Sequence, residues 1–123
     1  MMVTSDEAWK LAEQWIAAWN ARDLDQIMAH YEDSIELTSP VAAQLLNAPD
    51  GRVIGKAKLE AYFRRGLEAY PDLQFRLNDV LLGLRSVVLL YTNHNGTDVA
   101  EYMEFSSTRK ISRVVANYSA RKA

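Results

Sequence analysis

The sequence predicts an α+β fold, in which three N-terminal helices pack on one face of a curved antiparallel β-sheet. Three observations predict it. Apolar residues recur at three- and four-residue steps over much of the first 70 positions, a spacing typical of helices. After Pro71 the apolar spacing changes to two, which is typical of strands. The pair Asn95-Gly96 then favours a tight hairpin, because both central residues of a type I′ turn need positive φ.

Three helices are expected before Pro71. The first runs from about Ser5 to Asn20 and opens with a capping box formed by Thr4 and Glu7. The second is short and opens at Asp23, and its inward face is Leu24, Ile27, Met28 and Tyr31. The third runs from Lys56 to about Tyr70, and its buried face is Leu59, Tyr62, Phe63, Leu67 and Tyr70.

Short strands are expected at Ile35–Leu37 and Arg52–Ile54, separated by a partly mobile loop from Val41 to Gly51, in which residues 42–46 could form one helical turn. A long meander follows, with four strands at Leu73–Leu82, Ser86–His94, Thr97–Ser106 and Lys110–Ser119. No repeat or linker interrupts the chain, so residues 1–123 are expected to form a single domain.

Composition excludes several classes of function. The net charge is −2, so no broad basic surface exists to bind nucleic acid. There is no cysteine, which excludes disulfides and thiolate chemistry. Neither histidine has a partner at metal-ligand spacing, and His94 is expected in solvent because it precedes the turn. With no signal peptide or membrane span in the pattern, we expect a cytoplasmic protein that binds no metal or other cofactor.

Glu101 is the candidate catalytic residue. A two-residue turn at Asn95-Gly96 would place Leu90 opposite Glu101, on an interior face that also carries Met103. A carboxyl group in such surroundings loses hydration, which raises its pKa and suits it to general acid or base catalysis near neutral pH. The alternative is a structural Glu101 that lies at the rim or pairs with an arginine such as Arg113.

Aromatic side chains could shape a pocket for a flat, lipophilic ligand around this acid. Besides Leu90 and Met103, the candidate substrate-binding residues are Trp15, Trp19, Tyr31, Ser39, Tyr62, Phe63 and Tyr118. Ser39 ends the first strand, where a hydroxyl would lie at the lip of a pocket. The alternative is that the aromatic residues simply fill the core.

The opposite face of the hairpin is also apolar, although the helices can cover only one side of the sheet. We expect a homodimer that packs sheet against sheet through Leu89, Tyr91 and Tyr102, since an exposed apolar patch of that size is unusual in a monomer. The alternative is that the C-terminal residues fold back over this face.

The run from Trp15 to Asp25 resembles the first-helix signature of SnoaL-like proteins in the nuclear transport factor 2-like superfamily. Gly55 before the third helix and the step Tyr70-Pro71-Asp72-Leu73 after it resemble the same family, and the likeness covers nearly the whole chain. The resemblance implies a cone-shaped barrel that encloses a deep apolar cavity and is commonly dimeric. It also implies a function within a group that includes ketosteroid isomerases, polyketide cyclases and non-catalytic binders.

The catalytic residues of the ketosteroid isomerases match this sequence only in part. The oxyanion-hole tyrosine of these enzymes falls at Trp15 and their general-base aspartate at Ser39. Their second oxyanion donor falls at Glu101, or near Met103 when counted forward from Gly96. The resemblance therefore implies acid/base proton transfer by Glu101 on a small lipophilic molecule, as in an isomerase or cyclase. A non-catalytic ligand-binding or dimerisation module is the alternative.

Overall fold

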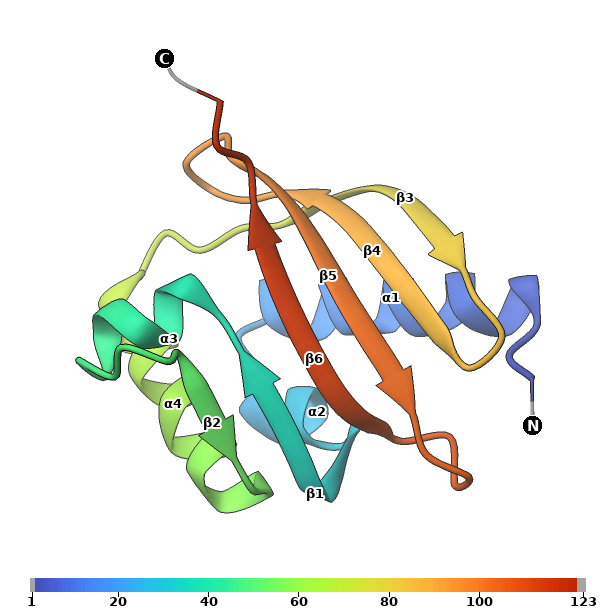
Figure 1. Cartoon of the computed structure of the whole chain (residues 1–123). Coiled ribbons are helices and arrows are strands. Elements are labelled where there is room, and N and C mark those ends of the chain that lie inside the picture. Colours follow the sequence, from blue (N-terminus) through green and yellow to red (C-terminus); the bar gives the residue numbers. More distant parts are fainter. Residues whose placement is uncertain (1, 122–123) are drawn as a thin grey trace.

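A computed structural model describes residues 2–121 and confirms the α+β fold class. Figure 1 shows one sheet with helices α1 and α2 behind it and α3 and α4 beside its β1–β2 end. The helices are α1 (Ser5–Asn20), α2 (Leu24–Met28), α3 (Pro40–Leu45) and α4 (Lys56–Ala69). The strands are β1 (Tyr31–Thr38), β2 (Arg52–Ile54), β3 (Arg76–Leu82), β4 (Ser86–Thr92), β5 (Asp98–Phe105) and β6 (Ile111–Tyr118).

The first two helices begin where their capping residues predict. The Thr4 backbone N–H donates to Glu7 Oε1 (3.0 Å), and the Glu7 N–H donates to Thr4 Oγ1 (3.1 Å), which completes the capping box. The Asp23 carboxylate accepts from the backbone N–H of Gln26 at the start of α2. Tyr31 is a difference from the expectation, because α2 ends at Met28 and Tyr31 begins β1.

The expected loop from Val41 to Gly51 is wrong at its start, where the chain forms α3. Ser39 caps this helix by accepting from the Val41 backbone N–H (3.1 Å), and Pro40 fits the first helical position, where no N–H is needed. Gly51 then returns the chain to β2 with a φ of 61°, and a Cβ there would lie 2.5 Å from the Ser39 carbonyl oxygen. This glycine lets α3 fold tightly against the end of β1.

The six strands form one sheet in the order β2-β1-β6-β5-β4-β3. Strands β3 to β6 form the expected antiparallel meander, whereas β1 pairs with β6 in parallel, so the sheet is not wholly antiparallel. A parallel pairing needs a long connection between its two strands, because a short hairpin can join only antiparallel strands. More than 70 residues separate β1 from β6 in the chain, so the connection is long enough.

The β4–β5 hairpin has a different register from the one expected. The Asn93 N–H donates to the Thr97 carbonyl (2.9 Å), so three residues rather than two form the turn, and Gly96 takes a φ of 77°. This is the three-residue loop in which a left-handed residue closes the turn. Leu89 therefore lies opposite Glu101, and Leu90 lies opposite Ala100 on the outer face.

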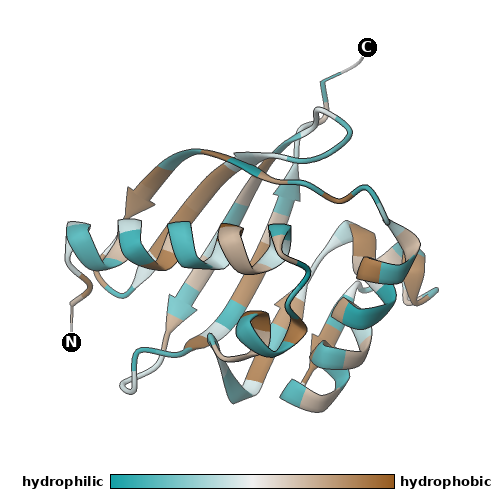
Figure 2. Cartoon of the chain, turned by 180° about the vertical axis from the view of Figure 1, so that it is seen from behind, coloured by the Kyte–Doolittle hydropathy of each residue, from teal (hydrophilic) through white to brown (hydrophobic). Residues whose placement is uncertain are grey.

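The inner face of the sheet packs against the helices and forms the core. On β4 and β5 this face consists of Val87, Leu89, Tyr91, Val99, Glu101, Met103 and Phe105, all buried. Figure 2 shows α1 crossing this side of the strands. No helix of the described part of the chain covers the outer face (Figure 1). Over residues 2–121, none of the helices is both long enough and apolar enough to cross a membrane.

Candidate functional site

A cavity of about 360 Å³ lies between the inner face of the sheet and helices α1, α3 and α4. Its walls are largely apolar, and they come from elements far apart in the chain. The residues that matter for its chemistry are Trp15, Trp19, Ser39, Tyr62, Phe63, Phe75, Tyr91, His94, Glu101 and Tyr118. The volume is within the range of pockets that hold small molecules.

Glu101 is one of two buried polar or charged residues among those that the structure describes, and only 6% of its surface is exposed. The Tyr91 hydroxyl donates a hydrogen bond of 2.8 Å to Glu101 Oε1. Because Tyr91 pairs with Val99, two positions from Glu101, the two side chains are diagonal neighbours on one face of the sheet. A tyrosine is long enough to bridge that distance, so the hairpin itself holds the pair together.

Burial raises the pKa of Glu101 from 4.5 to about 7, and the hydrogen bond from Tyr91 opposes this rise. Within residues 2–121, no cationic side chain forms an ion pair with this carboxyl. Arg113, the partner considered from the sequence, pairs instead with Glu104 (3.2 Å) on the outer face. Glu101 is therefore a desolvated acid that changes protonation near neutral pH.

Four buried or partly buried tyrosines lie near Glu101, and its charge affects the pKa of each of them. Burial is the main cause that raises the pKa of Tyr31, Tyr62, Tyr91 and Tyr118, and the charge of Glu101 raises each of them further. All four hydroxyls therefore stay protonated over the physiological range. They provide neutral hydrogen-bonding groups near the acid without providing a second charge.

Trp15 and Tyr31 form a closed pair beside the cavity. The Trp15 indole N–H donates to the Tyr31 hydroxyl over 2.9 Å, and both residues are almost fully buried. The Trp15 ring also lies 5.5 Å from that of Tyr91, centre to centre. Because this N–H is already hydrogen-bonded to Tyr31, Trp15 contributes ring surface to the cavity wall and no free hydrogen-bond donor.

Two buried nitrogens on cavity-lining residues lack a hydrogen-bond partner within residues 2–121: Trp19 Nε1 and His94 Nδ1. Trp19 packs edge-on against Phe63, with ring centres 4.8 Å apart. His94, expected in solvent, has a side chain only 10% exposed. Because unpaired buried polar groups are uncommon, both are candidates for contact with a bound molecule.

Seven of the residues chosen from the sequence meet at the cavity: Trp15, Trp19, Ser39, Tyr62, Phe63, Glu101 and Tyr118. Three do not line it. Leu90 lies on the outer face because of the register change, Met103 is fully buried in the core, and Tyr31 lies behind Trp15.

Sequence reasoning missed Tyr91 and His94 as cavity residues. The turn allowed a second interpretation as a three-residue loop, and that interpretation places Tyr91 on the same face of the sheet as Glu101.

Ser39 lies at the cavity as a capping residue, with 4% of its surface exposed. Its hydroxyl accepts from the Val41 N–H, and the polar Ser39 side chain partly offsets the rise in the pKa of Tyr62 and Tyr118. Among the described residues, Glu101 is the one carboxyl group on the cavity wall. A mechanism that needs two carboxylates therefore has no support in these residues.

The family model of the SnoaL-like domain matches residues 12–119. The chain belongs to the SnoaL-like family. A search of curated proteins found no significant match.

Among solved structures, the chain is similar to a SnoaL-like protein of unknown function from Burkholderia thailandensis, with 36% identity and a TM-score of 0.93. That match covers 98% of this chain and 100% of the other. A protein provisionally assigned as a ketosteroid isomerase, from Kribbella flavida, shares 16% identity with a TM-score of 0.75, covering 96% of this chain and 82% of its own. A cystatin-like protein of unknown function from Methylobium petroleophilum shares 15% identity, with a TM-score of 0.76 and coverage of 100% and 82%. The last two likenesses concern the fold.

Proposed function

We propose that this SnoaL-like protein binds a small lipophilic molecule in its cavity and transfers a proton on it, with Glu101 as the acid/base. The observation that carries the proposal is the Glu101 carboxyl itself, buried in an apolar cavity with one neutral donor and a pKa raised to about 7. A group with this pKa is present in both protonation states near neutral pH, which suits general acid–base catalysis.

The chemistry requires only one carboxyl group. In its ionised form, Glu101 takes a proton from a carbon next to the carbonyl group of the ligand, and the electron pair moves onto the carbonyl oxygen. In a ligand with a double bond between its β and γ carbons, the protonated Glu101 then gives the proton to the γ carbon, and the double bond moves into conjugation with the carbonyl group. The product is an isomer of the ligand, with no change in its atoms and no need for a cofactor. The same proton transfer would begin a cyclisation of the aldol type.

The residues that line the cavity limit the shape, polarity and size of the ligands that fit. The aromatic residues Trp19, Phe63 and Phe75 line the cavity and favour flat, apolar molecules. The volume of about 360 Å³ is at the lower end for ligand pockets, which favours a small molecule over a polymer. We expect such a reaction to take place in the cytoplasm.

A test uses 4-phenylcyclohexanone, a small apolar ketone, as the probe. The protein should accelerate exchange of the hydrogens next to its carbonyl group for deuterium in D₂O, which proton NMR follows directly. Glu101→Gln should lose this acceleration, because the amide cannot accept the proton. Glu13→Gln, the same change at an exposed position of α1, is the matched control and should keep it.

The second candidate function is ligand binding without catalysis. Two observations favour it: Ser39 stands where the resemblance implies a base, and the Trp15 N–H is occupied by Tyr31. Binding of the ketone can be followed by quenching of tryptophan fluorescence, since Trp15 and Trp19 line the cavity. Binding with no acceleration of exchange, or acceleration that persists in Glu101→Gln, would contradict the catalytic proposal; the first result would select this candidate.

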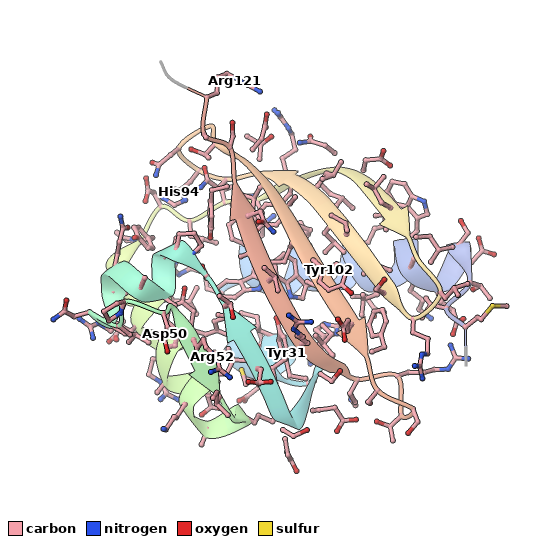
Figure 3. The ribbon with its side chains drawn as sticks, in the orientation of Figure 1. Tyr31, Asp50, Arg52, His94, Tyr102 and Arg121 are labelled. Atoms are coloured by element: carbon pink, nitrogen blue, oxygen red, sulfur yellow. The ribbon has the colours of Figure 1, made fainter. Side chains whose placement is uncertain are left out.

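We also propose a homodimer through the outer face of the sheet, but with different residues from those expected. Leu89 and Tyr91 point to the core, so of the three expected residues only Tyr102 remains on that face. Its centre is formed by Val88, Leu90, Ala100, Tyr102 and Val115, all partly exposed. Figure 3 shows Tyr102 on this uncovered side.

The charges beside this patch suit a second copy of the same chain. Glu104 and Arg113 lie together at its edge, so a two-fold contact can bring opposite charges together. Sedimentation velocity should give a dimer for the wild type and a monomer for Leu90→Arg. A monomeric wild type at micromolar concentration would contradict the proposal.

A further inference from the structure

The cavity has a second polar end, at the β4–β5 turn, which the proposed chemistry does not use. Residues 93, 94, 95 and 97 of this turn all line the cavity. The turn is held by the Asn93 side chain, whose Oδ1 accepts from the backbone N–H groups of Asn95 and Thr97, both at 3.0 Å. Because these bonds fix the backbone on both sides of His94, the imidazole is presented from a rigid support.

The His94 ring is held by the segment that follows α4. It lies 5.4 Å from the Tyr70 ring, centre to centre, and its Nε2 is 3.9 Å from Asp72 Oδ1. Nine-tenths of the side chain is buried, and Nδ1 has no partner within residues 2–121. Asp72 thus lies near Nε2 and Tyr70 packs beside the ring, while the buried Nδ1 has no hydrogen-bond partner within residues 2–121. A hydrogen bond to a buried group of this kind would be favourable.

The two polar ends of the cavity are well separated. Thr97 precedes Glu101 by four positions of extended chain, which is a rise of about 13 Å at about 3.3 Å per residue. His94 lies on the turn beyond Thr97's partner, Asn93. Between the two ends, the wall includes the apolar side chain of Val99 and the ring of Tyr91.

We infer that His94 is a specificity-determining residue that binds a hydroxyl group of the ligand, so that the ligand is an elongated apolar molecule with a carbonyl group at the Glu101 end and a hydroxyl group at the other. A hydroxyl is the matching group because it can donate to an unprotonated Nδ1 or accept from a protonated one. This inference rests on the proposed function, since it takes the carbonyl to lie at Glu101.

The test compares two probes that differ by one hydroxyl: 4-phenylcyclohexanone and 4-(4-hydroxyphenyl)cyclohexanone. Their dissociation constants are measured by isothermal titration calorimetry, which does not require turnover. The wild type should bind the hydroxylated ketone about fivefold more tightly, which corresponds to one hydrogen bond of about 1 kcal/mol. His94→Phe keeps an aromatic ring against Tyr70 and should abolish this preference, with little change for the probe that lacks the hydroxyl.

Two further variants separate recognition from a structural role. His94→Asn retains a hydrogen-bonding group near the position of Nδ1 and should recover part of the preference. His30→Phe makes the same change at the other histidine, which does not line the cavity, and should keep the full preference.

The negative results of this experiment separate the inference about His94 from the proposed function of Glu101. Equal affinity of the wild type for both probes, or a preference that survives in His94→Phe, would overturn the inference while leaving the exchange chemistry of Glu101 intact. Failure of the wild type to bind either ketone would overturn both the inference and the proposed function.

Discussion

Replacing Glu101 by glutamine should reveal how strongly the cavity disfavours its charge. The change keeps the size of the side chain and an oxygen that can accept from Tyr91, but it removes the ionisation. A rise in the pKa from 4.5 to about 7 corresponds to about 3 kcal/mol, since each pH unit is worth about 1.4 kcal/mol. The folded wild type holds its proton between these two values, whereas the unfolded chain has lost it.

The free energy of unfolding of the wild type should therefore fall as the pH rises through this interval. The penalty is nearly absent below pH 4.5 and complete above pH 7, when both states are ionised. Glutamine does not titrate, so the variant escapes it, and the contributions of all other groups cancel in the difference. Between pH 4 and pH 8, the variant should gain about 3 kcal/mol relative to the wild type.

Urea denaturation of both proteins at several pH values measures this difference. Two curves that run parallel from pH 4 to pH 8 would refute the reasoning, because they would show that the folded protein holds Glu101 at its ordinary pKa. A wild type that gains stability relative to the variant as the pH rises would show a carboxylate stabilised by the fold.

Two further predictions concern the hydrogen bonds of the cavity. Tyr91→Phe removes the donor that favours the ionised acid, so the pKa of Glu101 should rise above 7, and a pKa that stays or falls in a carboxyl NMR titration would contradict this role. Trp15→Phe should destabilise the fold by about 1 kcal/mol more than Trp19→Phe. The first change leaves the Tyr31 hydroxyl without its donor, whereas the second removes an N–H that has no partner among residues 2–121. Thermal or urea unfolding measures this pair, and equal losses would contradict it.

Local signals in the sequence were sufficient for most elements of the fold. The capping box at Thr4 and the change of apolar spacing after Pro71 placed α1 and the meander, because both depend on near neighbours in the chain. The start and extent of α3 were missed, although Ser39 as its cap and Pro40 at its first position are local signals for a helix start. The parallel pairing of β1 with β6 is a long-range contact for which the sequence holds no local signal.

The candidate site shows the same division. Glu101 was placed on the inner face correctly, because burial alternates along β5 whatever lies opposite. Its partner was missed, because a three-residue turn shifts β4 by one position and moves Tyr91 to the inner face and Leu90 to the outer one. His94 was expected in solvent for a related reason: the sequence does not show that Tyr70 and Asp72 return to cover the turn.

The proposed function requires a Glu101 side chain that carries its proton in the largely apolar cavity at pH 6 and loses it only near neutrality. Carbon-13 NMR of the side-chain carboxyl groups, with Glu101→Gln used to assign the resonance, follows that proton directly as the pH is raised. We expect a midpoint of about 7 in the ligand-free protein. A midpoint at or below 4.5 would contradict the proposed function, since such a carboxyl group would be fully ionised wherever the protein works.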